Sequence, residues 1–197
     1  VVEVRWANNT GIGDLAVPAP NLFTGGQWIY NLDPNPSFAG KVLINEIMFN
    51  PISGDDDDEF IEIHNRSGGA VNISDWQFVV GIDYTFPSNT PAMPAGAYWV
   101  VAKNPTNLLA IYTNLTTNTV FGPYDGTLAN GGERVVFTAA DYDRVLVGGQ
   151  QVIEKLPVPV SDLIYGDGGK WGQWSDGLGS SLELIDSESD VQNSANW

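Results

Sequence analysis

The sequence predicts an all-β fold, in which a two-layer β-sandwich follows an N-terminal extension. From residue 41 onward, short runs rich in Ile, Val and aromatic residues recur about every 8–15 residues, separated by turns that contain glycine or proline. Hydrophobic residues make up 43% of the 197 residues, which is enough for a packed core, and there is no cysteine to form a disulfide. We therefore expect the core alone to hold the sandwich together.

The clearest strands are predicted at residues 42–48 and 59–65, where Ile and Val alternate with polar residues. Strict alternation would place Leu43 and Ile47 on one face of the first strand. Glutamates repeat on both strands, which is unusual for strands that otherwise look built for a core. Between them lies a run of four aspartates.

The remaining elements follow the same signals. Further strands are predicted at residues 76–80, 98–103, 133–138, 151–156, 161–165 and 181–185. One helix of one or two turns is predicted at 105–112, because Pro105 suits a first turn and apolar side chains follow at helical spacing.

Residues 1–40 differ from the rest of the chain and are predicted to be an extension or the end of an upstream domain. Two strands are expected there, at 1–6 and 27–32, among turn-forming glycines, prolines and asparagines. Trp28 and Tyr30 need cover, so this segment is also predicted to pack on the main sheet. The main domain is predicted to span residues 41–197.

The formal net charge of −16 excludes several classes of partner. Nucleic-acid phosphates and anionic membrane surfaces would be repelled, since binding them depends on clustered Lys and Arg. No apolar run reaches the about 18 residues that a membrane span needs. The chain begins with valine, so we expect a processed product or a piece of a longer protein, and the lack of a visible signal peptide carries no weight.

Several segments, in order, resemble the lamin tail domain. They are residues 44–47 (Ile-Asn-Glu-Ile), 58–65 (Asp-Glu-Phe-Ile-Glu-Ile-His-Asn), 71–76 (Val-Asn-Ile-Ser-Asp-Trp), 94–102, 128–136, and the ending from 164 to 197 with its Gly- and Trp-rich loops. The resemblance covers about residues 41–197. It departs from the family pattern at Asp75, which replaces a usual glycine, and at 138–160, which is longer than expected.

This resemblance implies an immunoglobulin-like β-sandwich and a non-catalytic role. In animals the domain sits on nuclear filament proteins and binds other proteins, whereas bacterial members resemble modules of large secreted or surface proteins. A filament role is improbable here because the sequence has no heptad series. The resemblance therefore implies a binding or structural module of an extracellular or cell-surface bacterial protein. Its expected partners are a protein or a polysaccharide, and other domains of the same parent protein.

No catalytic residue is predicted. Glu46, Glu59 and Glu62 could form the carboxylate pair of a glycosidase, but spacing alone does not show a cleft. We favour structural roles, in which they accept hydrogen bonds from backbone groups or from Arg66 or Arg134. His64 is the single histidine and is predicted at the surface or rim, with no Gly-x-Ser-x-Gly nucleophile motif in the chain. A hydrolase is the third hypothesis.

Two further sets of residues are candidates for ligands. Asp55, Asp56, Asp57 and Asp58, here called the aspartate run, are predicted to bind calcium weakly. They lack EF-hand spacing, however, and a solvated hairpin tip is the favoured alternative. No other cofactor is expected. Trp171 and Trp174 lie among glycines and are candidates for stacking on sugar rings, so a carbohydrate-binding module is the alternative function. Trp76 and Trp99 are predicted to be core, and Trp197 to tuck the C-terminus against a sheet.

Overall fold

A computed structural model describes residues 2–6, 26–30, 40–147 and 150–197. The chain divides into two compact units, Val1–Ser37 and Phe38–Trp197, and each is described by itself. In the first, β1 (Val2–Trp6) pairs antiparallel with β2 (Gly26–Tyr30), close to the two predicted strands. The side chains of Trp28 and Tyr30 lie outside the described residues, and their packing stays a prediction.

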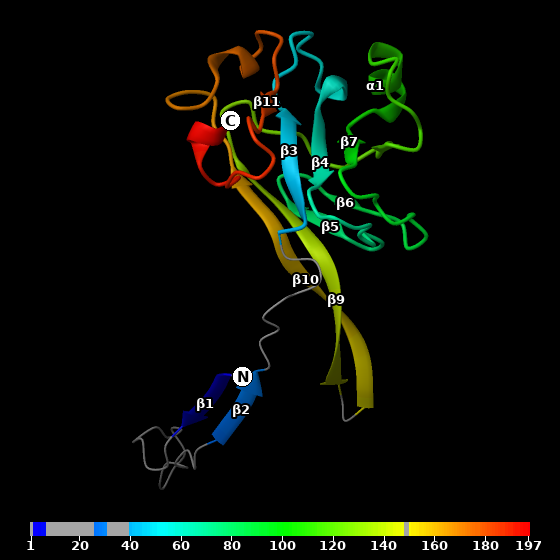
Figure 1. Cartoon of the computed structure of the whole chain (residues 1–197), viewed down its shortest axis with the longest axis vertical. Coiled ribbons are helices and arrows are strands. Elements are labelled where there is room, and N and C mark those ends of the chain that lie inside the picture. The colour runs from blue at the N-terminus through cyan, green and yellow to red at the C-terminus, as the bar shows by residue number, and fades with distance from the viewer. Residues whose placement is uncertain (1, 7–25, 31–39, 148–149) are drawn as a thin grey trace, which may run out of the picture. The chain divides into compact units, whose positions relative to one another are not determined.

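The second unit is a sandwich of two sheets (Figure 1). The five-stranded sheet has the order β11 (Leu182–Glu183), β3 (Val42–Met48), β4 (Phe60–Asn65), β7 (Tyr98–Ala102) and β8 (Val120–Phe121). The four-stranded sheet has the order β10 (Gln150–Ile164), β9 (Arg134–Val147), β5 (Gln77–Val80) and β6 (Tyr84–Thr85). Neighbouring strands are antiparallel except β7 and β8, which are parallel. The predicted β-sandwich is confirmed.

The main core lies between the two sheets and is rich in aromatic rings. Trp76 and Phe137 have ring centroids 5.5 Å apart, and Phe137 also contacts Phe78 at 4.7 Å. Trp99 packs from the other sheet against Phe121 at 4.8 Å. Both tryptophans predicted to be core are buried, which confirms that prediction.

A β-bulge at Asn45 changes which side chains of β3 face the core. The pairing of β3 with β4 shifts between Ile44 and Glu46, so Asn45 is an extra residue on its strand. Ile44 and Ile47 both belong to the core between the sheets, whereas Leu43 does not. The expectation that Leu43 and Ile47 share a face was therefore wrong, because simple alternation does not include the extra residue.

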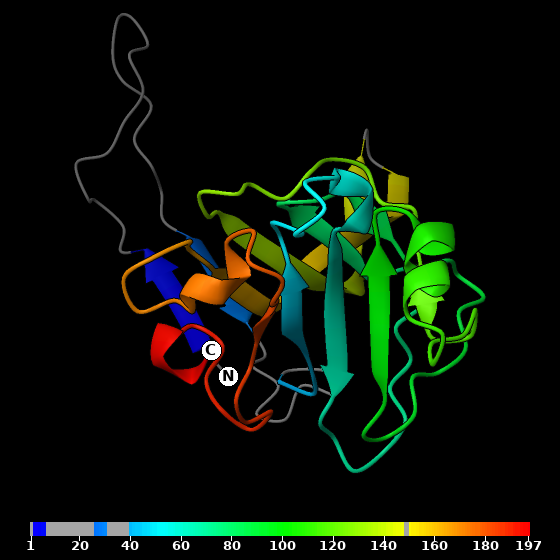
Figure 2. The ribbon, with the colours of Figure 1, turned by 90° about the horizontal axis from the view of Figure 1, so that it is seen from above.

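A second, smaller core lies on the outer face of the five-stranded sheet. The helix α1 (Pro105–Ile111) begins after Asn104, whose side chain accepts a hydrogen bond from the Asn107 N–H, and it confirms the predicted helix. Leu108 from α1 packs there with the buried side chains Met48, Phe60, Val100, Ala102 and Val120. Figure 2 shows β3, β4 and β7 side by side, with α1 next to β7. No helix in the described part of the chain is long and apolar enough to cross a membrane.

The strands β9 and β10 form a long antiparallel ribbon that projects beyond the sandwich (Figure 1). The predicted strands 151–156 and 161–165 are one continuous strand in the structure. Two prolines separate them in the sequence, but β10 is an edge strand, where a residue without an N–H donor is tolerated. The extra length of 138–160 relative to the family pattern lies in this ribbon.

Asp75 has a left-handed backbone conformation, with φ of 62°. It stands where the family pattern has glycine, the residue that adopts positive φ without steric cost. Its carboxylate accepts hydrogen bonds from the Ser88 hydroxyl at 2.6 Å and the Tyr142 hydroxyl at 3.0 Å. These bonds, and the tolerance of aspartate for this conformation, account for the replacement.

Candidate ligand-binding site

A row of three glutamates crosses the outer face of the five-stranded sheet. Glu183 on β11 lies opposite Glu46 on β3, which lies opposite Glu62 on β4. The bulge at Asn45 brings Glu46 onto this face, because it shifts the alternation of β3 by one residue. Like charges directly opposite each other on neighbouring strands are unfavourable, which makes the row unusual.

A pocket of about 180 Å³ opens beside this row, under the C-terminal end of α1. Its lining combines the carboxylates of Glu46 and Glu62 with apolar and aromatic side chains and one amide: Phe60, Val100, Leu108, Tyr112, Asn114 and Leu115. The glutamates were candidate residues from the sequence, but the pocket was not predicted. Asn114 and Leu115 follow the helix in a polar segment, and nothing in their local pattern marks them as neighbours of β4.

Burial and the neighbouring negative charges raise the pKa of both acids. Burial, together with the charges of Glu46 and Glu183, raises the pKa of Glu62 to about 7, against the hydrogen bond that Asn45 donates to its Oε1 at 2.9 Å. Burial also raises the pKa of Glu46, opposed by the hydroxyl of Ser181, which donates to its Oε1. Both groups are acids whose ionised form is costly in this environment.

Glu59 directly precedes β4, and its side chain is fully buried inside the sandwich. Its Oε2 accepts hydrogen bonds from the Tyr124 hydroxyl at 2.8 Å and from the Leu128 N–H at 3.0 Å. Burial raises its pKa to about 7 against these bonds. The prediction of a backbone donor is confirmed for this residue.

The predicted arginine partners of the glutamates were wrong. The Arg66 side chain donates to the carbonyl oxygens of Gly40 and Ser187, and Arg134 forms an ion pair of 2.6 Å with Asp162. Arg134 is exposed and Arg66 is partly buried, and both are bound by surface groups rather than by the glutamates.

His64 is buried rather than at the rim, so that prediction was also wrong. The imidazole is 6% exposed and stacks on Tyr98, its neighbour across β4 and β7, with ring centroids 4.1 Å apart. Its Nδ1 has no hydrogen-bond partner among the described residues. Burial lowers the pKa of His64, while Glu188 acts in the opposite direction and Arg66 adds to the lowering.

The aspartate run forms a short 3₁₀ helix, Asp56–Asp58, that docks onto α1. Asp57 accepts from the Asn104 amide at 3.0 Å, and Asp58 accepts from the Asn107 amide at 2.6 Å. Asp55 caps the turn by accepting from the Asp57 N–H. No group of three or more acids, histidines or cysteines placed to hold a metal occurs among the described residues. Calcium binding by this run stays a prediction.

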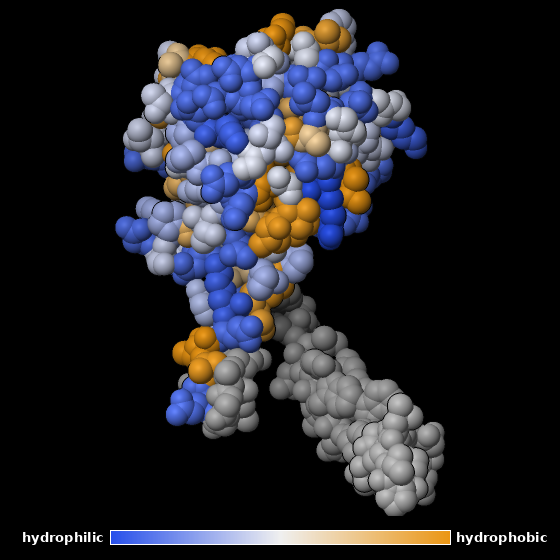
Figure 3. Space-filling view, turned by 180° about the vertical axis from the view of Figure 1, so that it is seen from behind, coloured by the Kyte–Doolittle hydropathy of each residue, from blue (hydrophilic) through white to orange (hydrophobic). Residues whose placement is uncertain are grey.

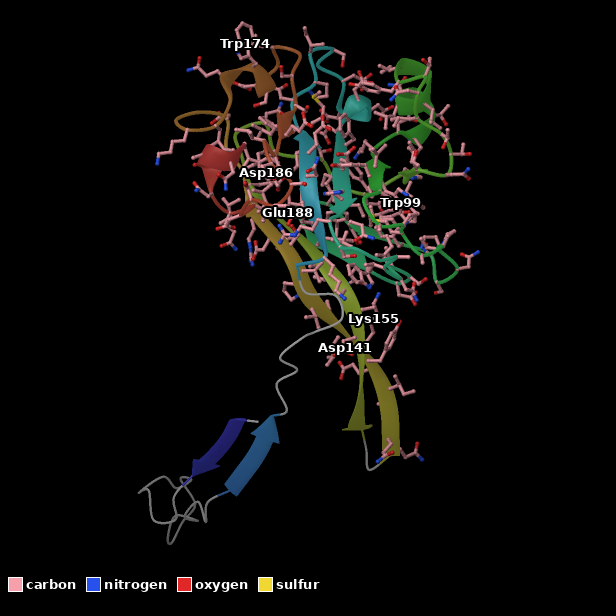
Figure 4. The ribbon with its side chains drawn as sticks, viewed as in Figure 1. Trp99, Asp141, Lys155, Trp174, Asp186 and Glu188 are labelled. Carbon is pink, nitrogen blue, oxygen red and sulfur yellow. The ribbon has the colours of Figure 1, made fainter. Side chains whose placement is uncertain are left out.

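The two candidate tryptophans have different surroundings. Trp171 is half-buried, packs on the core and lies 6.2 Å from the ring of Trp197, and a Cβ on Gly166 would lie 2.9 Å from its ring. Trp197 donates its indole N–H to the Val191 carbonyl and packs on the same core, where the C-terminus was predicted to tuck. Trp174 is 69% exposed, at the loop end of the domain (Figure 4).

Trp174 belongs to an apolar loop end made with Ile52 and Leu178, which are 74% and 58% exposed. Two loops distant in the sequence meet there, because the Asn50 side chain donates to Asp176 at 2.7 Å and the Asn50 carbonyl accepts from the Gly177 N–H. Figure 3 shows orange, apolar atoms at this end of a surface that is mostly hydrophilic. Only Trp174 was predicted from the sequence, since isolated Ile and Leu residues in loops do not indicate a binding surface.

A sequence model of the family described as Lamin Tail Domain matches residues 35–188 of this chain. The match begins before β3 and ends before the final 3₁₀ helix, so it includes both sheets of the sandwich. The chain matches none of the curated proteins with which it was compared. The domains of this family are non-catalytic and immunoglobulin-like, as is the pair of sheets described above. The chain belongs to the lamin tail domain family.

Proposed function

We propose that this domain is a binding module of a larger secreted or cell-surface bacterial protein, and that it recognises a protein or polysaccharide partner. The observation that carries the proposal is the apolar loop end of Ile52, Trp174 and Leu178. Exposed apolar side chains on loops that a rigid scaffold holds together are typical of interaction surfaces. The net charge of −16 suits an exterior surface and disfavours nucleic acid.

The acids of the domain support a non-catalytic role. Glu59 binds a tyrosine hydroxyl and a backbone N–H inside the core, and Glu62 and Glu46 are held by Asn45 and Ser181. Each carboxylate thus has a structural partner. A hydrolase would show turnover that Glu62→Gln abolishes, and such a result would overturn the proposal.

The proposal is tested by cross-linking on the cells that make the parent protein. A benzophenone amino acid replaces Ile52 in the full parent protein, and the matched control replaces Ile185, which is 75% exposed and lies outside both loops. We expect a defined cross-linked product from position 52 that is absent from position 185. With the benzophenone amino acid at position 174 instead, Ile52→Ser and Leu178→Ser should reduce the cross-linked product. Equal products from both positions would contradict the proposal.

A carbohydrate-binding module is the second candidate, and the exposure of Trp174 favours it. A flat indole ring open to solvent is a platform on which a sugar ring can stack. On a glycan array we expect Trp174→Ala to abolish any signal, because it removes the exposed ring on which the sugar would stack. Trp171→Ala should instead lower the melting temperature, because Trp171 packs against Trp197. An array without hits would exclude this candidate.

A further inference from the structure

The geometry points to the pocket beside Glu46 and Glu62 as the binding site for a lysine side chain of a partner protein. This inference rests on the proposed binding function and names the chemistry of the partner. It concerns the outer face of β3 and β4 with α1, which is separate from the apolar loop end described above. Three observations carry it: the size of the pocket, the division of its lining, and the oxygen atoms left free.

The size of the pocket suits one side chain. Its volume of about 180 Å³ is below the about 300–1,000 Å³ of small-molecule sites. The walls are Phe60, Leu108, Tyr112 and Leu115, which would contact an aliphatic stem. A lysine buries its four-carbon stem along apolar surface and keeps its charge at one end. Apolar walls with acids at one side fit that division.

The free oxygens distinguish lysine from arginine. Oε1 of Glu62 accepts from Asn45 and Oε1 of Glu46 accepts from Ser181, whereas neither Oε2 has a hydrogen-bond partner in the described part of the chain. Two single oxygens on different side chains suit an ammonium group, whose three donors rotate about a compact charge. The planar fork of arginine prefers both oxygens of one carboxylate.

The pocket also lacks a positive charge of its own. No lysine or arginine belongs to its lining, whereas Glu46, Glu62 and Tyr112 do, and Glu183 lies opposite Glu46 on the neighbouring strand. An ammonium group would relieve the repulsion between Glu46 and Glu62, which adds to the burial that raises the pKa of Glu62 to about 7. Affinity for the cation should accordingly fall as the pH drops below that value, because the protonated acid no longer attracts it.

The test uses four small probes with the isotopically labelled full chain at pH 8, followed by amide NMR shifts. n-Butylamine carries both the stem and the charge, 1-butanol carries the stem alone, ammonium carries the charge alone, and n-butylguanidine carries the arginine head. We expect n-butylamine to shift the amide signals of the pocket-lining residues and to bind with higher affinity than any other probe. Its affinity should fall at pH 5.5.

Two variants test the assignment of the site. Glu62→Gln should weaken n-butylamine binding by about tenfold or more, since a hydrogen bond to a charged group is lost. Glu154→Gln removes the same charge from the exposed ribbon and should leave binding unchanged. The assignment to lysine would be overturned if 1-butanol or ammonium bound as tightly as n-butylamine, or if n-butylguanidine bound more tightly.

The outcome is separable from the test of the binding function. If n-butylamine fails to bind while the cross-linker at position 52 still captures a partner, the lysine pocket is wrong and the binding function stands. If n-butylamine binds with the stated dependence on Glu62 and position 52 captures nothing, the pocket stands and the loop end is not the recognition surface.

Discussion

Glu59 accepts a hydrogen bond of 2.8 Å from the hydroxyl group of Tyr124 inside the sandwich, and the same oxygen accepts from the Leu128 N–H. We expect Glu59→Ala to lower the free energy of unfolding by about 2 kcal/mol or more, because it leaves two buried donors without an acceptor. Glu59→Gln keeps an acceptor and should cost much less. Urea unfolding at neutral pH measures both, and equal losses would show that the hydrogen bonds are unimportant.

The left-handed conformation of Asp75 gives an ordered series of stabilities. Asp75→Gly loses the bonds from Ser88 and Tyr142 but relieves the positive φ, so its free energy of unfolding should stay within about 1 kcal/mol of the wild type. Asp75→Ala loses the same bonds and keeps an unfavourable φ, at a cost of about 1–2 kcal/mol. Thermal and urea unfolding give the order. A glycine variant less stable than the alanine variant would contradict it.

Glu62 should make the domain more stable at lower pH. Burial raises its pKa to about 7 in the folded state from an ordinary value of 4.5, so its contribution to stability is present below pH 4.5 and is lost as the pH rises through 7. Relative to wild type, Glu62→Gln should therefore be stabilised more at pH 8 than at pH 5. The difference in unfolding free energy between variant and wild type should change by about 1–3 kcal/mol between the two pH values. Urea titrations at the two pH values test this, with Glu154→Gln as the control. Parallel pH dependence in both variants would argue against it.

His64 should act in the opposite direction. Burial lowers its pKa, so its contribution to stability is present above the ordinary value of 6.5 and is lost as the pH falls below it. His64→Phe keeps the stacking on Tyr98 and removes the titration. We expect the wild type to lose more unfolding free energy than His64→Phe when the pH is lowered from 8 to 5. A constant difference would mean that the pKa of His64 is the same in the folded and unfolded states.

The calcium prediction for the aspartate run has a direct thermal test. A site of the strength of extracellular calcium modules should raise the melting temperature in millimolar calcium relative to chelator, since a ligand of the native state stabilises it. Asp56→Asn should abolish the rise, because the Asp56 carboxylate is exposed and bonded to no other side chain in the described structure. Asp167→Asn, with the same charge change in another loop, should not. Equal melting temperatures in calcium and chelator would exclude the site.

The sequence predicted the strands well because their alternation and their turns are local properties. Residues 42–48 form β3 with the predicted bounds, and the helix at 105–112 differs from α1 by one residue. The bulge at Asn45 could not be predicted in this way, because the alternation pattern treats the asparagine as an ordinary position of the strand. The bulge determines on which face of β3 the Glu46 side chain lies, so the row of three glutamates could not be predicted from the sequence.

The candidate site depended on contacts between segments far apart in the chain. His64 looked like a rim residue because it follows a glutamate on its strand, but Tyr98 on β7 covers its ring. Pro157 and Pro159 looked like the end of a strand, and only the sheet order shows that they lie on an edge. The walls of the pocket come from α1 and the segment after it, whose docking on the outer face no local pattern indicates.

The β9–β10 ribbon has a consequence for how the domain folds. Its pairing joins residues that are near one another in the chain, on either side of residues 148 and 149, so these contacts close short loops and form quickly. Closing the sandwich instead requires the Ile44 N–H of β3 to reach the Ser161 hydroxyl of β10, 117 residues away in the chain. The loop entropy of that closure is the larger barrier. We therefore expect the ribbon to be structured in the folding transition state, while the bond from Ile44 to Ser161 forms late.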